Sequence, residues 1–377
     1  MTTYNLVNSV KGGCGKTTFS IWMAYYLNTL SEEDYQKAKE QLALAEMYVM
    51  GSMHTEAVDE VREKMLEMTK KISRCEKEIN TAVLIDMDLL GTSMLAIFNG
   101  NHDACKTAVT NEIFQGVKDS RKEFIEKIKL KNGKYINVIF SSMNHLERDK
   151  FKAGRYAGYS PVVKHSMFRS GLRELLKCNK RIDGKKVKHF ILDMPPNSDG
   201  FSDAAMECIF NKKYSVADND DRKNLFIMIG SDWGQTIATI AELETLLKRS
   251  DDMMPDRIFL VINHNLRGNF GEECYQIRKD KIEEALKGMN LAEKERERFF
   301  FLKMYNNEKY TELGIGMGSG GIGLRNADSG VIGDAFPKAV ITAAAQYGKE
   351  FEDILNDDNG KRKLRKLILG EDDEKNG

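Results

Sequence analysis

The sequence has no excess charge of either sign, no closely paired cysteines and no long apolar run. Lysine plus arginine and aspartate plus glutamate each number 57 in 377 residues, so no overall field attracts nucleic acid or an anionic membrane. Any such binding must depend on a local patch. No apolar stretch approaches 18 residues and the polar start leaves no room for a signal peptide, so we expect a cytoplasmic protein.

The cysteines exclude two kinds of site. The sequence has six, none in a C-x-x-C pair and none with a histidine at metal-binding spacing: Cys14, Cys75, Cys105, Cys178, Cys208 and Cys274. This scatter is typical of free thiols in a reducing compartment. We therefore expect neither a disulfide nor a zinc site.

Short apolar runs that end at turn residues recur along the chain and predict strands. They are Tyr4–Val10, Ala82–Asp86, Ile136–Phe140, Phe190–Asp193, Leu225–Ile229 and Ile258–Ile262. The segments between them are long enough for helices, and Thr17–Leu30 has helical spacing. The alternation predicts an α/β fold with a mainly parallel sheet and helices on both faces. We expect one domain over residues 1–355 and a charged tail over 356–377.

Two segments depart from this alternation. Residues 31–80 are polar and free of proline, with a break near Gly51 and Ser52, which predicts two long helices in an antiparallel hairpin. This insertion is either a solvated decoration or an arm for oligomerisation or a partner. Residues 311–333 contain eight glycines, a density that forbids a regular element and predicts a loop.

A glycine-rich loop follows the first predicted strand and opens the first predicted helix. Its residues are Lys11, Gly12, Gly13, Cys14, Gly15, Lys16, Thr17 and Thr18. In this setting backbone N–H groups surround a β-phosphate, and the helix N-terminus adds its positive dipole end. Lys16 would neutralise phosphate charge, Thr17 would ligate Mg²⁺, and Cys14 would contribute only its backbone amide. The loop predicts ATP and Mg²⁺ as ligands.

Lys11 stands where an ordinary phosphate-binding loop has a glycine, which gives the pattern K-G-G-x-G-K-T. In this the sequence resembles the ParA/MinD family of deviant Walker A P-loop ATPases. The resemblance implies a homodimer closed around ATP, in which Lys11 reaches the nucleotide of the other subunit. It also implies slow hydrolysis of ATP to ADP and phosphate, stimulated by a partner protein.

Two aspartate segments continue the resemblance. Asp86 and Asp88 follow a predicted strand in a D-x-D-x-x-G segment similar to the family's switch I, and Asp193 ends a strand before two prolines, as in its Walker B and switch II. Carboxylates at the carboxyl edge of parallel strands lie near a bound triphosphate. We expect Asp88 to position the attacking water, and Asp86 and Asp193 to support the metal.

A weaker part of the resemblance is Asn263, directly after the run Ile258–Ile262. It matches an asparagine that contacts adenine in the family. Asparagine is also a common residue at strand ends, so the turn interpretation stays open beside the base contact.

Three basic segments raise the question of a binding surface. Residues 118–134 and 150–156 fit either a nucleic-acid contact or a solvated face. Residues 361–369 alternate five cations with apolar residues, which suits an anionic membrane surface, DNA or ordinary packing on the domain.

The resemblance therefore implies an ATPase that positions or partitions DNA or other cargo and is nucleoid- or membrane-associated in its ATP-bound form. The alternative is a MinD- or TadZ-like localisation factor for a membrane-associated or secretion machine. A metal-cluster enzyme lacks its cysteine ligands here, and a tyrosine autokinase lacks its C-terminal tyrosine cluster, since no tyrosine follows Tyr347.

Overall fold

A computed structural model gives the arrangement of the chain. It describes residues 1–21, 23–24, 27–28, 32, 35–36, 38–39, 42–43, 55–89, 94, 124–129, 135–141, 158–195, 200–230, 233–248, 255–264, 271–289, 291 and 297–305. The predicted glycine-rich loop at 311–333, the tail at 356–377 and the basic run at 150–156 lie outside these residues. Within the described part no helix is long and apolar enough to cross a bilayer.

Eight strands form one sheet in the order β10-β9-β8-β1-β7-β2-β4-β3. Their bounds are β1 (Thr3–Asn8), β2 (Ala82–Asp86), β3 (Glu126–Lys129), β4 (Tyr135–Ile139), β7 (His189–Asp193), β8 (Arg222–Ile229), β9 (Arg257–His264) and β10 (Phe299–Tyr305). Neighbours pair in parallel except β3, which runs antiparallel to β4. The predicted α/β fold with a mainly parallel sheet is confirmed. A separate hairpin consists of β5 (Arg181–Ile182) and β6 (Lys185–Lys186).

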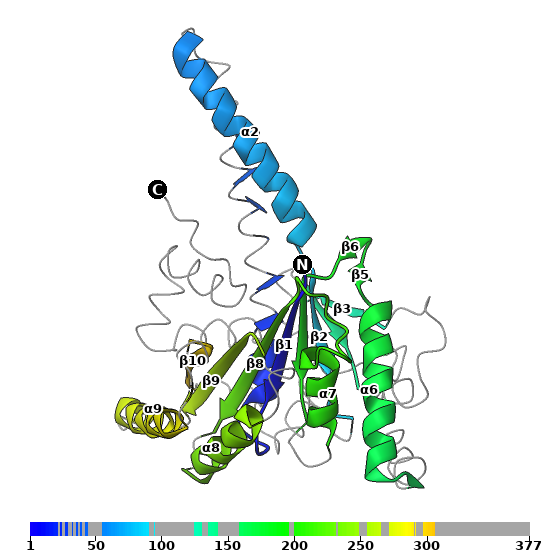
Figure 1. Cartoon of the computed structure of the whole chain (residues 1–377). Helices are drawn as coiled ribbons and strands as arrows, with labels where there is room; N and C mark the ends of the chain where they lie inside the picture. Colours follow the sequence, from blue (N-terminus) through cyan, green and yellow to red (C-terminus); the bar gives the residue numbers. More distant parts are fainter. Residues whose placement is uncertain are drawn as a thin grey trace, which may run out of the picture.

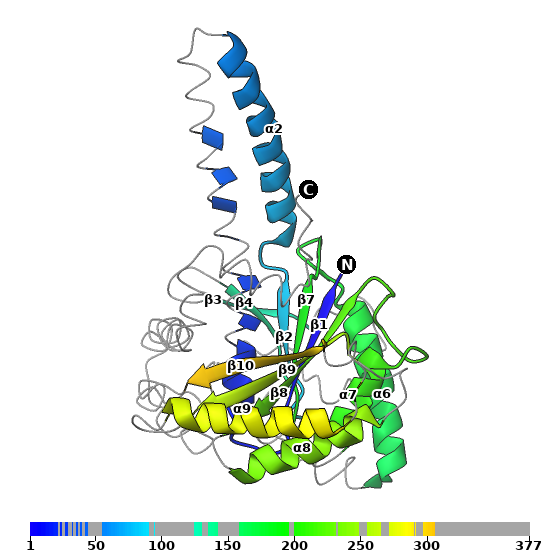
Figure 2. The ribbon, with the colours of Figure 1, turned by 60° about the vertical axis from the view of Figure 1, so that its left-hand side comes forward.

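Helices cover both faces of the sheet (Figure 2). The helices with bounds are α2 (Thr55–Glu78), α6 (Pro161–Cys178), α7 (Phe201–Phe210), α8 (Trp233–Leu247) and α9 (Gly271–Gly288). All described residues from Lys16 to Ala43 are also helical, and we call them the first helix. Phe19 of the first helix lies 5.5 Å from Phe226 of β8 between ring centroids, on the side of the sheet opposite α7 and α8 (Figure 2).

The other face of the sheet is covered by α6, α7 and α8. Tyr4 of β1 stacks on Phe190 of β7, with ring centroids 5.4 Å apart. Phe168 of α6 stacks on Phe201 of α7 at 4.8 Å, and these side chains belong to one buried apolar cluster. Burial of all six residues of β1 follows from its place at the centre of the sheet, covered on both sides.

A long arm lies within the predicted insertion at residues 31–80. Helix α2 projects away from the sheet, and the described helical residues up to Ala43 lie beside it in both views (Figures 1 and 2). At 24 residues α2 is about 36 Å long. The predicted break at Gly51 and Ser52 lies outside the described residues. The function of the arm stays a prediction.

Several strand boundaries differ from the sequence prediction. Val10 is not part of β1, because the chain turns at Ser9, whose N–H donates to Asn8 Oδ1 at 2.8 Å. β9 extends to His264, so Asn263 lies within the strand and not after it. The sequence prediction also missed β10, the β5–β6 hairpin and β3, which occupies part of the basic stretch 118–134.

Candidate functional site

The glycine loop follows the carboxyl end of β1, a strand that lies between β7 and β8 in the sheet. It leads directly into the first helix at Lys16. Gly13 and Gly15 have φ angles of 77° and 90°, a left-handed region that glycine enters at little cost. Helical hydrogen bonding begins when the Phe19 N–H donates to the Gly15 carbonyl at 2.9 Å. The loop thus forms a turn that ends in a helix N-terminus, the arrangement that binds phosphate.

The Lys16 side chain is buried and held by the start of the loop. Its Nζ donates to the Ser9 hydroxyl at 2.9 Å, and that hydroxyl donates to the Lys11 carbonyl at 2.7 Å. Lys16 is only 8% exposed, whereas Lys11, Gly12 and Gly13 are exposed at the surface of the loop. One serine therefore connects the buried lysine to the backbone of the exposed one.

Asp193 lies at the end of β7, beside the beginning of the first helix. Its Oδ1 accepts a hydrogen bond from the Ser20 hydroxyl at 3.2 Å. Burial raises the pKa of Asp193 from 3.8 to about 6, although Lys16 and hydrogen bonds from Thr17 and Ser20 act in the opposite direction. A cation bound beside Asp193 would favour its ionised form and would offset the cost of burying that charge.

Asp86 occupies the matching position on the neighbouring strand. It pairs in register with Asp193, one residue at the end of β2 and the other at the end of β7. Asp86 Oδ2 accepts from the Ser141 hydroxyl at 2.8 Å, and Oδ1 accepts from the Asp88 N–H at 3.1 Å. Burial, followed by the charges of Asp88 and Asp193, raises the pKa of Asp86 well above its usual value.

These oxygens fit Mg²⁺ by their chemistry. Mg²⁺ prefers carboxylate, hydroxyl and water oxygens, and it usually keeps several waters and takes phosphate ligands from the substrate. Among the described residues, no three acidic, histidine or cysteine side chains come together as a complete metal cage. The Thr17 hydroxyl with Asp86 and Asp193 would therefore hold Mg²⁺ together with water and phosphate oxygens.

Asn263 lies beside the loop, with its side chain 4% exposed. Its Nδ2 donates to the Cys14 carbonyl at 2.8 Å, which joins Asn263 to the loop. Within the described part of the chain the buried Oδ1 of Asn263 has no hydrogen-bond partner. An unpaired buried acceptor costs free energy until a donor reaches it. The exocyclic amine of adenine is a donor of the required kind.

The remaining predicted residues lie around these groups. Asp88 is half-buried two residues after β2, and Thr18 is buried in the first turn of the first helix. The loop, Asp86, Asp88, Asp193 and Asn263 thus gather at the carboxyl ends of β1, β2, β7 and β9. Residues 90–93 of the predicted switch I segment and 196–199 after Pro195 lie outside the described residues.

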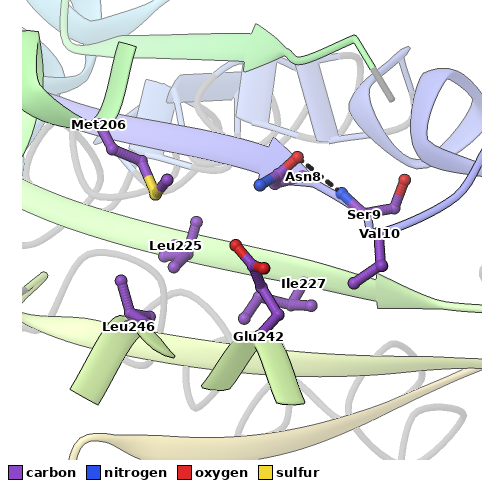
Figure 3. A pocket seen from close by; sticks show the side chains of 8 residues that line it. All are labelled: Asn8, Ser9, Val10, Met206, Leu225, Ile227, Glu242 and Leu246. Carbon is purple, nitrogen blue, oxygen red and sulfur yellow. Dashed lines mark hydrogen bonds between the residues drawn. The ribbon is translucent and has the colours of Figure 1, made fainter. Parts of the chain in front are cut away.

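A pocket lies below the loop between β1, β8, α7 and α8 (Figure 3). Asn8, Ser9 and Val10 line its upper side, and Glu242 of α8 extends into it. Its other lining residues are Met206, Leu225, Ile227 and Leu246. Neither Lys16 nor Thr17 lines this pocket, so we do not assign the nucleotide to it.

Sequence reasoning missed three hydroxyl groups that hold the charged side chains. Ser9, Ser20 and Ser141 contact Lys16, Asp193 and Asp86 respectively. Ser20 is four residues after Lys16 and therefore lies on the same side of the helix, which is a signal that spacing contains. Ser141 follows β4 at the same sheet edge.

The chain has an α/β fold consistent with that of the P-loop nucleoside triphosphatases: a mainly parallel sheet in which a glycine loop joins a central strand to a helix that begins with lysine. No family model and no curated protein matches the sequence. A solved structure of an McdA variant from Cyanothece in complex with ATP is similar at a TM-score of 0.46. It shares 13% identity, and the match covers 91% of this chain and 96% of that one.

Proposed function

We propose that this protein is a Mg²⁺-dependent ATPase that dimerises around ATP and positions or partitions DNA or another cargo. The observation that carries the proposal is the placement of Lys16 and Thr17 beside Asp193. A phosphate loop alone would bind an anion. A loop whose first helical turn adjoins a buried aspartate favours a phosphate together with its divalent cation.

Each residue has a distinct task in this proposal. The loop amides and Lys16 bind the β- and γ-phosphates, and Lys16 leaves Ser9 to do so. Mg²⁺ bound at Thr17 would neutralise phosphate charge, while Asp86 and Asp193 orient the waters around it. Asp88 positions the attacking water, and Asn263 accepts a hydrogen bond from adenine through Oδ1.

Dimerisation is proposed from Lys11. This lysine is exposed at the surface of the loop, where an ordinary phosphate-binding loop has a glycine. A second subunit that faces the loop would receive Lys11 near its own nucleotide, and the added charge would stabilise the transition state. Hydrolysis is slow in the absence of a partner protein that completes the site.

The test is the molar mass in solution, measured by light scattering with ADP, with ATP and without nucleotide. We expect twice the 42.8 kDa of one chain only with Mg²⁺ and ATP. Lys11→Ala should bind ATP as the wild type does and remain at the mass of one chain. Lys213→Ala changes an exposed lysine far along the chain and serves as the matched control. A wild-type mass that ignores ATP would refute dimerisation.

A further inference from the structure

A concentrated group of cations lies at the amino ends of the strands, the end of the sheet opposite the phosphate loop. The segment from Lys177 to Lys188 contains six lysines and arginines and one acidic residue, Asp183. It includes the β5–β6 hairpin and leads into β7 at His189. β7 runs from this end of the sheet to Asp193 at the candidate nucleotide site, so the length of one strand, about 17 Å, separates the hairpin from that site.

The hairpin that carries these cations is held in one conformation. Asp183 and Gly184 have φ angles of 48° and 75°, the pair of left-handed residues that a tight two-residue hairpin turn requires. Arg181 Nη1 donates to the Gly184 carbonyl at 2.9 Å across the turn. At the base, the Val187 N–H donates to the Lys180 carbonyl at 2.9 Å. The cations therefore project from a defined scaffold, which lowers the entropy lost on binding.

Two acidic residues near the hairpin are paired with lysines. Asp183 forms an ion pair with Lys127 of β3, and Lys177 pairs with Glu174 at 3.0 Å. Five cations remain: Lys180, Arg181, Lys185, Lys186 and Lys188. Among the described residues none of these five forms an ion pair with a carboxylate. The segment from Lys177 to Lys188 therefore has a positive net charge although the chain as a whole is neutral.

The arm adds to this surface. Helix α2 packs against β6, and Figure 1 shows the hairpin beside the end of α2 that joins the sheet. Lys77 is exposed in the last turn of α2. The Lys188 N–H donates to the carbonyl of Thr81, just after the helix, at 3.0 Å. These backbone contacts bring cations from two elements to the same end of the sheet, and we call this set the hairpin surface: Lys77, Lys180, Arg181, Lys185, Lys186 and Lys188.

We infer that the hairpin surface binds the phosphate backbone of nucleic acid. The apolar side chains of the hairpin, Ile182 and Val187, are 6% and 1% exposed, so the hairpin offers charge without an apolar group to insert into a membrane. Contacts to phosphate carry no sequence information, so we expect this binding to be independent of sequence. Because the hairpin surface lies at the end of the sheet opposite the candidate nucleotide site, it binds nucleic acid with or without ATP. A dimer closed at the nucleotide edges would carry two such surfaces facing apart.

The test is the salt dependence of binding to a duplex DNA of random sequence, measured by fluorescence anisotropy without nucleotide. Six phosphate contacts, one for each cation of the hairpin surface, predict a slope of log K against log salt of about −5. Replacement of Lys185, Lys186 and Lys188 by glutamine should reduce the slope by about 3 and weaken binding more than tenfold at low salt. Replacement of the same three by arginine should preserve both values.

The matched control removes three exposed or half-exposed lysines from α9: Lys279, Lys281 and Lys287 to glutamine. This control should bind DNA as the wild type does. An equal loss in the control, or an unchanged slope in the hairpin variant, would overturn the inference. So would a wild-type protein that binds vesicles with 30% anionic lipid but not DNA.

This inference does not depend on the proposed ATPase function, and one variant separates the two. Lys16→Ala should lose ATP binding and keep the wild-type slope for DNA. If Lys16→Ala retains ATP binding, the nucleotide site is wrong and the hairpin surface stands. If Lys16→Ala alone lowers the DNA slope, the phosphate contacts lie at the loop edge and the hairpin surface is wrong.

Discussion

Replacing Asp193 by asparagine should stabilise the protein without nucleotide and weaken its binding of Mg²⁺ and ATP. Burial raises the pKa of Asp193 from 3.8 to about 6, so the folded protein binds this proton more tightly than the unfolded chain does. The free energy of unfolding therefore decreases as pH rises from about 4 to about 6 and stays lower above that range. At pH 7 the ionised carboxylate costs up to about 3 kcal/mol.

Asparagine has the shape of the protonated acid and no charge, so Asp193→Asn should recover up to about 3 kcal/mol at pH 7. Urea denaturation without nucleotide measures this difference, which should shrink when both proteins are unfolded at pH 4.5. Asp220→Asn changes an exposed aspartate and should shift the free energy of unfolding by less than about 0.5 kcal/mol. A less stable Asp193→Asn protein, or a gain that does not change with pH, would refute the reasoning.

Three further predictions concern the same site. Asp88→Ala should keep the affinity for ATP and Mg²⁺ and lose at least about a hundredfold in steady-state phosphate release, because orienting water acts in the transition state; wild-type turnover would refute its role. Calorimetric affinity for Mg²⁺ and ATP should fall as pH drops below about 6, since Asp193 then binds a proton, and this decline should be absent in Asp193→Asn. Asn263→Ala should reduce the preference for ATP over GTP in competition binding, because Oδ1 is the buried acceptor offered to the base; an unchanged preference would contradict the adenine contact.

Local patterns in the sequence predicted where the loop and the two aspartates lie in the fold. The glycine loop has its strand before it and its helix after it, and Asp86 and Asp193 each end a buried apolar run, so their position at one sheet edge follows from parallel pairing. The contact between Asn263 and the Cys14 carbonyl joins residues 249 positions apart. No local pattern contains such a contact, because it depends on β9 lying two strands from β1.

The missed strands have physical reasons of their own. β3 has the sequence Glu126-Lys-Ile-Lys129, and an edge strand of this kind needs no apolar run because only part of it is covered. β5 and β6 have two residues each, too few for any periodicity. Asp183 and Gly184 between them were the available signal, since this pair is typical of tight hairpin turns.

The central claim is that the loop from Lys11 to Thr18 binds ATP with Mg²⁺. Calorimetric titration of ATP into the wild type and into Lys16→Ala, with and without Mg²⁺, tests it most directly. Lys16 is the buried cation beside Asp193, so its removal takes away the charge that faces the β- and γ-phosphates. We predict one site per chain in the wild type, tighter with Mg²⁺, and no measurable heat of binding in the variant. Equal affinities in the two proteins would contradict the account.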